Sequence, residues 1–375
     1  MSGKRISTIL VLCVLVVLLA GCSLPYITPP AEYSATDAPT ITPPVPGTAA
    51  PSTPTFEPVA REITVENAAN LSAAVIAPAS NVQAIVWAKD SATIGIITQN
   101  PDANGNEVSS AVMMDAKTLA TAAFFSSPDG RIADISSDGK SVAVISSDMY
   151  SLTIYDLTDS NRDIVAITPG YLINNVTFAP NGKSFAVSSN ESWQVSLHSM
   201  PDGAEIKILT GFETAAPVYN AGFKGSNDVI AWHARATIQT QSVSTGKMGV
   251  ATSSEDFVDQ YALSPDGKLL ASAAMKTIDG NYTSTVTLWN ASSGAEVRIL
   301  ILTQSVSCMA FSADGTMLAI GTGNDIQVFE VSSGLPLATL GGHSGPPTTV
   351  AFAPDGYSLV SAGHDNQLIL WQVMK

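Results

Sequence analysis

The side chains that could carry out chemistry in this chain are few and scattered. The four histidines are His198, His233, His343 and His364. No two of them show the His-x-His or His-Glu-x-x-His spacing of a zinc site. A Walker loop, a Gly-x-Ser-x-Gly elbow and a paired-acid signature are also missing from the sequence. We therefore predict a protein that is not an enzyme and that needs no metal or cofactor.

Two further candidates are weak. Residues 102–107 read Asp-Ala-Asn-Gly-Asn-Glu, but no glutamate stands at the twelfth position, where a calcium loop needs its bidentate ligand. A polar loop between strands explains this segment better. Cys308 begins the apolar run Cys-Met-Ala-Phe, which predicts a small buried side chain in a strand and not a nucleophile.

Composition excludes several classes of protein. Of 375 residues, 45% are apolar, so the chain can build a large core and is not disordered as a whole. Lys and Arg number 17 against 32 Asp and Glu, which gives a net charge of −15. The basic residues are too few and too scattered for a nucleic-acid partner or for docking on anionic lipid.

The N-terminus has the pattern of a bacterial export signal. Lys4 and Arg5 precede an apolar run from Ile6 to Leu19, which is shorter than the roughly 20 residues of a bilayer span. The run ends in the residues Leu19, Ala20, Gly21 and Cys22. This ending resembles the lipobox of bacterial lipoproteins. The resemblance implies a signal peptide over 1–21, a lipid on Cys22, and anchoring to the bacterial cell membrane facing outside the cytoplasm. The alternative is an ordinary signal peptide with a chance cysteine.

Residues 22–60 form a predicted disordered tether. Ten prolines stand there among Thr, Ser and Ala, with no helical or strand period. Such a spacer reaches between roughly 35 Å as a coil and about 100 Å if stiff. It would hold a folded domain clear of a membrane. The alternative is a proline-rich ligand for a partner.

From residue 61 onward the chain repeats one pattern of short strands. In the last copy a strand at 349–352 leads into the turn Ala-Pro-Asp-Gly at 353–356, and two more strands follow. Comparable turns fall near residues 90, 138, 181, 226, 266, 314 and 355. They are 40 to 48 residues apart. Four strands at this period are typical of the blades of a β-propeller, and no unit shows a helical period.

We predict an all-β, seven-bladed propeller over residues 61–375. The blades are expected near 84–125, 131–168, 174–210, 218–252, 259–301, 306–340 and 348–375. The last unit supplies only three strands. Within segment 62–77, Leu71 to Ile76 is a spare strand, and we predict that it becomes the outer strand of the last blade and closes the ring.

The repeat resembles the WD40 family, in which a blade begins with Gly-His and ends with Trp-Asp. The last unit matches best: it has Gly342-His343, and then Ser361, Asp365 and Trp371. The resemblance implies that His343, Ser361, Asp365 and Trp371 form a buried hydrogen-bonded chain that stiffens the blade. A Ser-His-Asp hydrolase is the alternative for these residues. Other units place Met114, Tyr155, His198, Gln241, Trp289 and Phe329 at the tryptophan position, and there we expect apolar packing instead.

The loops suggest where a partner binds. The connections 99–108 and 275–283 are longer than their counterparts, and the connection 210–218 carries an unexplained aromatic residue. The family resemblance places these loops on one face. The candidate binding rim is Asn100, Asn104, Asn106, Phe212 and Tyr282. We expect a monomeric, non-catalytic scaffold with a protein or peptide partner. The alternatives are a sensor propeller that binds a glycan or small molecule in its channel, and a propeller hydrolase or lyase.

Overall fold

The computed structural model describes residues 60–102, 104–127, 129–159, 162–189, 194–209, 219–223, 228–234, 237–249, 252–253, 258–278 and 281–373. The chain divides into two units, Met1–Phe56 and Glu57–Lys375, and every described residue belongs to the second. The predicted signal peptide, the lipobox and all but residue 60 of the predicted tether lie outside the described residues. Within the described residues no helix is long and apolar enough to cross a membrane.

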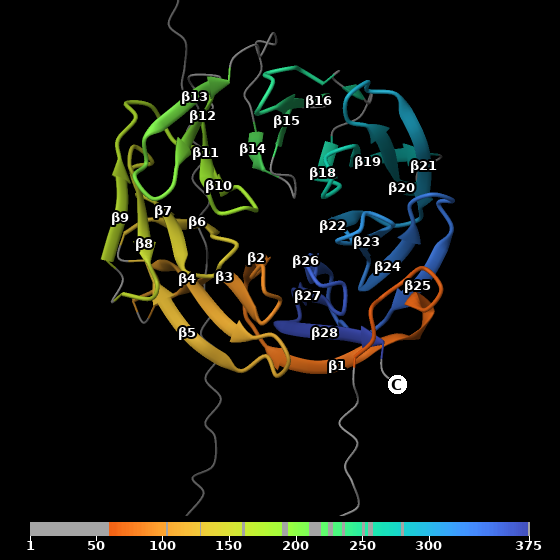
Figure 1. Ribbon diagram of the computed structural model, residues 1–375. Helices are drawn as coiled ribbons and strands as arrows, with labels where there is room; N and C mark the ends of the chain where they lie inside the picture. Colours follow the sequence, from red (N-terminus) through yellow and green to blue (C-terminus); the bar gives the residue numbers. More distant parts are fainter. Residues whose placement is uncertain are drawn as a thin grey trace, which may run out of the picture. The chain divides into compact units, whose positions relative to one another are not determined.

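The second unit is a ring of seven four-stranded antiparallel sheets, as predicted (Figure 1). Blade 1 comprises β2 (Val82–Trp87), β3 (Thr93–Pro101), β4 (Glu107–Asp115) and β5 (Thr121–Ser126). Blade 2 comprises β6 (Arg131–Ile135), β7 (Ser141–Ile145), β8 (Leu152–Asp156) and β9 (Arg162–Ile167). Blade 3 comprises β10 (Asn175–Phe178), β11 (Ser184–Ser189), β12 (Gln194–Ser199) and β13 (Glu205–Leu209).

The other four blades repeat this arrangement. Blade 4 comprises β14 (Tyr219–Phe223), β15 (Val229–Ala234), β16 (Thr237–Ser242) and β17 (Thr252–Ser253). Blade 5 comprises β18 (Val258–Leu263), β19 (Leu269–Ile278), β20 (Asn281–Asn290) and β21 (Glu296–Leu302). Blade 6 comprises β22 (Val306–Phe311), β23 (Met317–Thr322), β24 (Asp325–Glu330) and β25 (Pro336–Leu340). Blade 7 comprises β26 (Pro347–Phe352), β27 (Leu359–Gly363), β28 (Gln367–Val373) and, outermost, β1 (Leu71–Pro78).

The turn between the first two strands of a blade is built from four residues with fixed roles. In blade 5 the Ser264 hydroxyl donates to the Asp266 carboxylate (2.7 Å) and accepts the N–H of Leu269 (2.9 Å). Gly267 then takes φ +69°, a conformation that costs other residues about 1–2 kcal/mol. Blades 2 and 6 repeat these bonds through Ser136 and Ser312. The repeated Asp-Gly pair in the sequence therefore marks a real and repeated turn.

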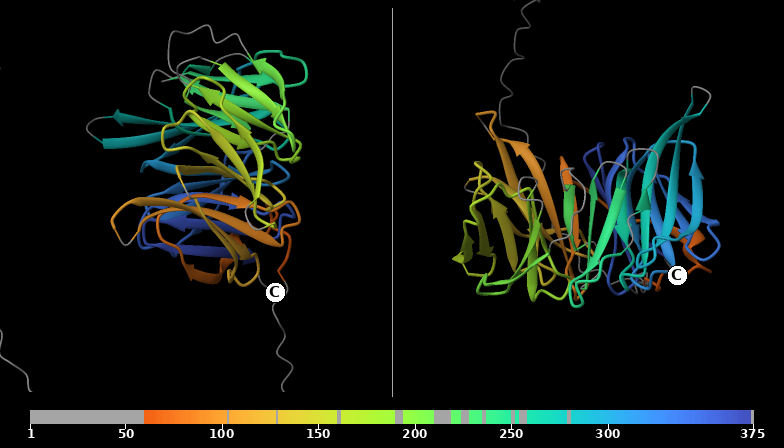
Figure 2. Two further views of the ribbon diagram at one scale, coloured as in Figure 1. Left: turned by 90° about the vertical axis from the view of Figure 1, so that its left-hand side faces the viewer. Right: turned by 90° about the horizontal axis from the view of Figure 1, so that it is seen from above.

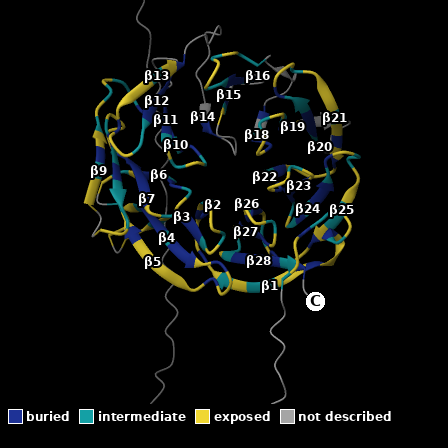
Figure 3. Ribbon diagram, in the orientation of Figure 1, coloured by how far each residue is buried: buried dark blue, intermediate teal, exposed yellow. Residues whose placement is uncertain are grey.

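The core lies between neighbouring blades. Figure 3 shows the middle strands of the blades mostly buried, the strands that line the channel partly buried, and the outermost strands largely exposed. Every residue of β7 and of β23 is buried, as expected for strands that have a sheet packed on each face. Cys308 belongs to one of the clusters between blades and is 6% exposed, and burial raises the pKa of its thiol to about 12. The prediction of a small buried residue is confirmed.

The ring closes as predicted. β1 pairs with β28 in antiparallel register, from Leu71 opposite Val373 to Pro78 opposite Gln367. Blades 7 and 1 are also joined on the inner side. The Thr348 hydroxyl donates to the carbonyl of Val82 (3.1 Å), and the indole N–H of Trp87 donates to the carbonyl of Ala351 (3.1 Å).

The segment that leads into β1 is itself part of the core. Ala68, in the three-residue helix η1 (Ala68–Asn70), is completely buried, and Ile63 is 4% exposed. Asn67 holds this segment in shape, because its side chain accepts the N–H of Thr64 and donates to the carbonyl of Glu62, both at 2.8 Å. The sequence Ile-Thr-Val-Glu-Asn-Ala therefore caps the contact between blades 6 and 7.

The ring has two different faces. The turn face carries the connections between first and second strands and between third and fourth strands. The hairpin face carries the connections between second and third strands and between blades. Both ends of the described domain lie on the turn face, where Arg61 donates its N–H to the carbonyl of Val373 (3.0 Å) and Ile63 donates to Gly356 (2.8 Å). Figure 2 shows the β3–β4 and β19–β20 hairpins projecting from the opposite side.

The two connections predicted as long loops are mostly strand. β3 and β4 stay paired as far as Pro101 and Glu107, and β19 and β20 as far as Ile278 and Asn281. The predicted extent of the loops, 99–108 and 275–283, was wrong, because cross-strand pairing continues through most of both segments. The structure thus presents two stiff projections on the hairpin face.

Candidate functional site

Four side chains in blade 7 form a continuous hydrogen-bonded chain. The indole N–H of Trp371 donates to the hydroxyl of Ser361 (2.8 Å), which lies 2.8 Å from Nε2 of His343. The other ring nitrogen, Nδ1, is 3.0 Å from both carboxylate oxygens of Asp365. With a proton on Nδ1, every donor among these four side chains has an acceptor. The structure therefore brings together all four residues that the resemblance pointed to.

Two glycines make room for this chain. A Cβ on Gly342 would lie 2.9 Å from the Trp371 ring, and one on Gly363 would lie 2.8 Å from Nδ1 of His343. The carboxylate of Asp365 also accepts the N–H of Ser344 (2.8 Å). Burial by itself would raise the pKa of Asp365, but this bond and the one from His343 outweigh burial and lower that pKa.

Ser361, His343 and Asp365 follow one another as in a catalytic triad, but they are not accessible to a substrate. Ser361 is completely buried, and its hydroxyl already accepts the Trp371 indole. A nucleophilic serine must instead reach a substrate carbonyl. These residues tie the loop before blade 7 to the strands of the blade, and they face no substrate.

The expectation that the other blades rely on apolar packing alone was wrong for three of them. In blade 5, Trp289 donates to Ser272 (2.8 Å). In blade 3, His198 lies 2.9 Å from the Ser196 hydroxyl and 3.0 Å from the Gly203 carbonyl. In blade 4, the amide of Gln241 donates to the Gly246 carbonyl (2.9 Å). Polar groups buried at this position need a partner, which the neighbouring strand supplies in blade 5 and the following turn supplies in blades 3 and 4.

The predicted binding rim is only partly described. Phe212 lies outside the described residues, and so does the side chain of Tyr282, whose backbone belongs to β20. Figure 1 shows the β3–β4 and β19–β20 hairpins in blades 1 and 5, separated across the ring. The two hairpins share the hairpin face but do not form one patch.

The asparagines of the rim stabilise the β3–β4 hairpin. Asn100 accepts a hydrogen bond from Asn81 (3.1 Å). The Asp102 carboxylate accepts the N–H groups of Asn104 (2.7 Å) and Asn106 (2.9 Å) and the side-chain amide of Asn106 (3.1 Å). The backbone N–H of Asn106 is the main group that lowers the pKa of Asp102. These bonds use the oxygens that a calcium ion would need, which favours the polar-loop interpretation.

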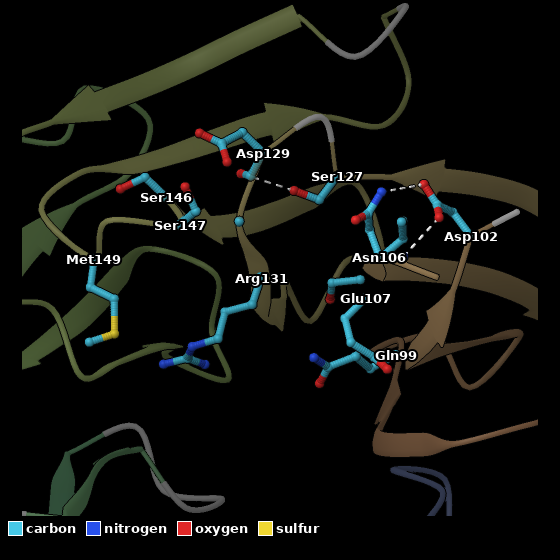
Figure 4. Close-up of a pocket in the computed structure, with 13 residues that line it drawn as sticks. Gln99, Asp102, Asn106, Glu107, Ser127, Asp129, Arg131, Ser146, Ser147 and Met149 are labelled. Carbon is cyan, nitrogen blue, oxygen red and sulfur yellow. Dashed lines mark hydrogen bonds between the residues drawn. The ribbon is translucent and has the colours of Figure 1, made fainter. Parts of the chain in front are cut away.

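A groove of about 480 Å³ opens on the hairpin face between blades 1 and 2 (Figure 4). Its walls come from the β3–β4 hairpin, the β5–β6 connection and the β7–β8 turn. Asn106 from the predicted rim lines it, together with Glu107, Asp129, Arg131 and Met149. Loss of hydration lowers the pKa of the Arg131 guanidinium, which remains charged at neutral pH. Neither Arg131 nor Met149 was among the residues predicted from the sequence.

The central channel has a volume of about 560 Å³ and is lined by the first strands of all seven blades. Its described wall mixes apolar side chains with polar ones such as Gln83, Gln260 and Thr348. Asp134 is the one charged residue of that described lining, and its carboxylate accepts the N–H groups of Ile135 (2.9 Å) and Phe178 (2.8 Å). Nowhere in the described residues do three His, Cys, Asp or Glu side chains gather as a metal site would require.

Comparison with known proteins adds sequence evidence to this geometry. The family model of the WD domain, G-beta repeat, matches residues 297–330 and 334–372. Each match begins in the outer strand of one blade and continues through the first three strands of the next. The repeat in the sequence is therefore offset by one strand from the blade, which is why the last blade needs a strand from the N-terminus.

Several WD-repeat proteins are similar to this chain. The WD repeat-containing protein sll1491 of Synechocystis is 36% identical over 111 residues, which is 29% of this chain and 30% of that protein. The periodic tryptophan protein 2 homolog of Neurospora crassa is 39% identical over 71 residues, 18% of this chain and 8% of that protein. The small ribosomal subunit protein RACK1 of Schizosaccharomyces pombe is 27% identical over 128 residues, 32% of this chain and 38% of that protein.

Fold and sequence now agree on the class of protein. The described domain is a closed seven-bladed β-propeller. Its residues 297–330 and 334–372 are WD40 repeats, and it spans well under half the length of the relatives named above.

Proposed function

We propose that this protein is a lipid-anchored scaffold of the bacterial cell envelope, which binds a protein partner on its hairpin face without catalysing a reaction. One observation carries the proposal. The described domain begins and ends on the turn face, and its two stiff projections lie on the opposite face. The first described residues therefore enter the domain on the turn face and do not cover the hairpin face.

Two further observations support a binding role over a catalytic one. The triad-like residues of blade 7 are buried, and the one acid in the described channel lining is already bonded to backbone N–H groups. Among the similar proteins, RACK1 is by its name a component of the small ribosomal subunit. A ring closed by paired strands is a rigid platform, which lowers the entropic cost of binding.

The anchor is tested by labelling cells that express the full chain with radioactive palmitate. We expect label in the wild type and none in Cys22→Ala, with the wild type in the membrane fraction. A labelled Cys22→Ala chain would contradict the assignment of the lipid to Cys22. Cys308→Ala is the matched control, because that thiol is buried in the propeller and its loss should leave labelling unchanged.

The binding role is tested by crosslinking in intact envelopes, followed by purification of the chain. We expect a defined partner with the wild type, and loss of that partner when the hairpin face is altered. Phe212→Ala with Tyr282→Ala tests the predicted rim. Phe124→Ala, which removes an exposed aromatic residue from the outer strand of blade 1, is the control. Recovery of no specific partner by the wild type would contradict the scaffold proposal.

A further inference from the structure

We propose that the groove between blades 1 and 2 holds an extended segment of the partner protein that carries a lysine or arginine side chain. This inference rests on the proposed function and adds a site and a chemical class of partner. The groove has a volume of about 480 Å³, which is within the usual range for binding sites in proteins. Three observations support the proposal: the β7–β8 turn repeats another turn of the same blade, Met149 in that turn has an unusual backbone conformation, and the groove is lined by an excess of carboxylates.

The β7–β8 turn repeats the β6–β7 turn ten residues later. Residues 136–141 read Ser-Ser-Asp-Gly-Lys-Ser, and residues 146–151 read Ser-Ser-Asp-Met-Tyr-Ser. In both turns the first serine donates to the aspartate, which accepts an N–H two residues later (3.0 Å in both). In both, the same serine accepts the N–H of the last serine (2.9 and 3.0 Å). The two turns differ at two positions, where Met149 replaces Gly139 and Tyr150 replaces Lys140.

Met149 takes the left-handed conformation that glycine takes in the matching turn. Its φ is +63°, against +69° for Gly139. Of the described residues other than glycine, four more have positive φ: Asn81, Ser91, Leu119 and Asn366. Asparagine tolerates this region, and serine is small. Leu119 is 3% exposed, so the burial of its side chain offsets the energetic cost of its positive φ. Met149, in contrast, is 38% exposed.

Packing in the core therefore does not explain Met149. Its side chain lines the groove, and Tyr150, the next residue, is 45% exposed. Strain at an exposed position is typical of sites that bind another molecule. Methionine is flexible and polarisable and can adapt to the aliphatic stem of a partner side chain.

The charges of the groove select a basic partner. Three carboxylates and one guanidinium line it. The guanidinium of Arg131 donates to the carbonyl of Asn174, and the Asp102 carboxylate is bonded within its own hairpin. For the carboxylates of Glu107 and Asp129, no hydrogen bond or ion pair joins them to any described residue. A lysine or arginine of the partner would complement these two groups.

The test is a selection of random peptides, displayed in a library balanced for lysine and glutamate, on the purified full chain. We expect enriched peptides to pair a basic residue with an apolar one, and to bind the variants Met149→Gly and Glu107→Gln/Asp129→Asn about tenfold more weakly. Glu205→Gln/Glu296→Gln removes two exposed carboxylates from the outer strands β13 and β21, and it should bind as the wild type does.

Loss of binding in Met149→Gly must not come from unfolding. Glycine relieves the strained backbone, so the melting temperature of this variant should stay equal to that of the wild type or rise. The matched swap, Gly139→Met, should lower it, since the added Cβ would also lie 3.0 Å from Met113. Binding by Met149→Gly that equals wild type, or enrichment of acidic peptides, would overturn the groove assignment. The scaffold proposal fails separately, if envelope crosslinking yields no partner.

Discussion

Blades 7 and 5 both carry a tryptophan in their third strand, and in both blades it donates to a serine of the second strand. The two blades differ in the residues that surround this pair. In blade 7, Trp371 lies opposite Leu359 and donates to Ser361, two residues further along. In blade 5, Trp289 lies opposite Leu270 and donates to Ser272, again two residues further along. The bond between tryptophan and serine therefore follows from strand register alone.

Among the described residues, the rest of this hydrogen-bonded network is found only in blade 7. His343 belongs to the connection that enters the blade, and Asp365 belongs to the turn between β27 and β28. Adding these two residues fastens a loop to the sheet, whereas the tryptophan–serine pair fastens one strand to its neighbour. The motif therefore has two separable parts: the tryptophan–serine pair joins neighbouring strands, and the histidine–aspartate pair joins a loop to the sheet.

The largest effect is expected from the one strand that blade 7 borrows. Deleting residues 62–77 removes β1 and the buried residues Ile63 and Ala68, and it exposes the edge of β28. We expect the free energy of unfolding, measured in urea, to fall by about 5 kcal/mol or more. Deleting sixteen residues from the predicted tether, 40–55, is the control. An unchanged unfolding curve after loss of 62–77 would contradict the closure of the ring by β1.

A smaller effect separates the two tryptophan blades. Ser361→Ala leaves both the Trp371 indole and the His343 imidazole without their partner, and we expect a loss of about 2–3 kcal/mol. Ser272→Ala leaves only the Trp289 indole unpaired, and we expect about 1 kcal/mol. Urea unfolding of the two variants side by side measures the difference. Equal losses would mean that His343 and Asp365 add nothing to the stability of blade 7.

The smallest effect concerns acid. The Ser264 hydroxyl is the main group that lowers the pKa of Asp266, to about 2, against an ordinary value of about 3.9. Because the folded pKa is the lower one, the carboxylate stabilises the fold above roughly pH 4, and this contribution is lost as the pH falls through about 2. Blade 3 already has an amide at this position, since Asn181 accepts the N–H of Lys183 (2.9 Å).

Asp266→Asn should therefore be less stable than the wild type near neutral pH, and thermal melts should show the difference shrinking toward pH 2. Asn181→Asp is the matched control. Its turn has Ala179 in place of the serine, so the new carboxylate has no hydroxyl partner. The stability of this variant should therefore depend less on pH. A constant difference between Asp266→Asn and wild type across this range would show that the carboxylate's charge is irrelevant to stability.

Much of the fold could be predicted from the sequence because its turns repeat. In blades 2, 5, 6 and 7 an Asp-Gly pair marks a turn glycine with positive φ, and comparable turns recur in the other blades, so the number of blades and the spare strand at Leu71 followed from the spacing of these turns. The chain of hydrogen bonds in blade 7 was predicted from the resemblance alone. The partners of His198 and Gln241 were missed, because both bond to glycine carbonyls, which carry no signal in a side-chain pattern.

The groove could not be predicted in the same way. Its walls come from three connections in two blades, and their proximity depends on how the blades pack. One signal was nevertheless present, since residues 146–151 repeat residues 136–141 with methionine in place of glycine and tyrosine in place of lysine. Comparing turns with one another, as well as with a family motif, would have pointed to Met149.

The borrowed strand also has a consequence for how the molecule is made. Leu71 pairs with Val373, so the two strands that seal the ring lie almost at opposite ends of the domain. A ribosome delivers the first of them long before the second. Until the final residues are synthesised, β1 has no strand to pair with, and its apolar side chains remain exposed to water. Contacts between such distant parts of a chain form slowly. A chain that still lacks β28 therefore leaves the edge of β1 unpaired, which favours aggregation and proteolysis.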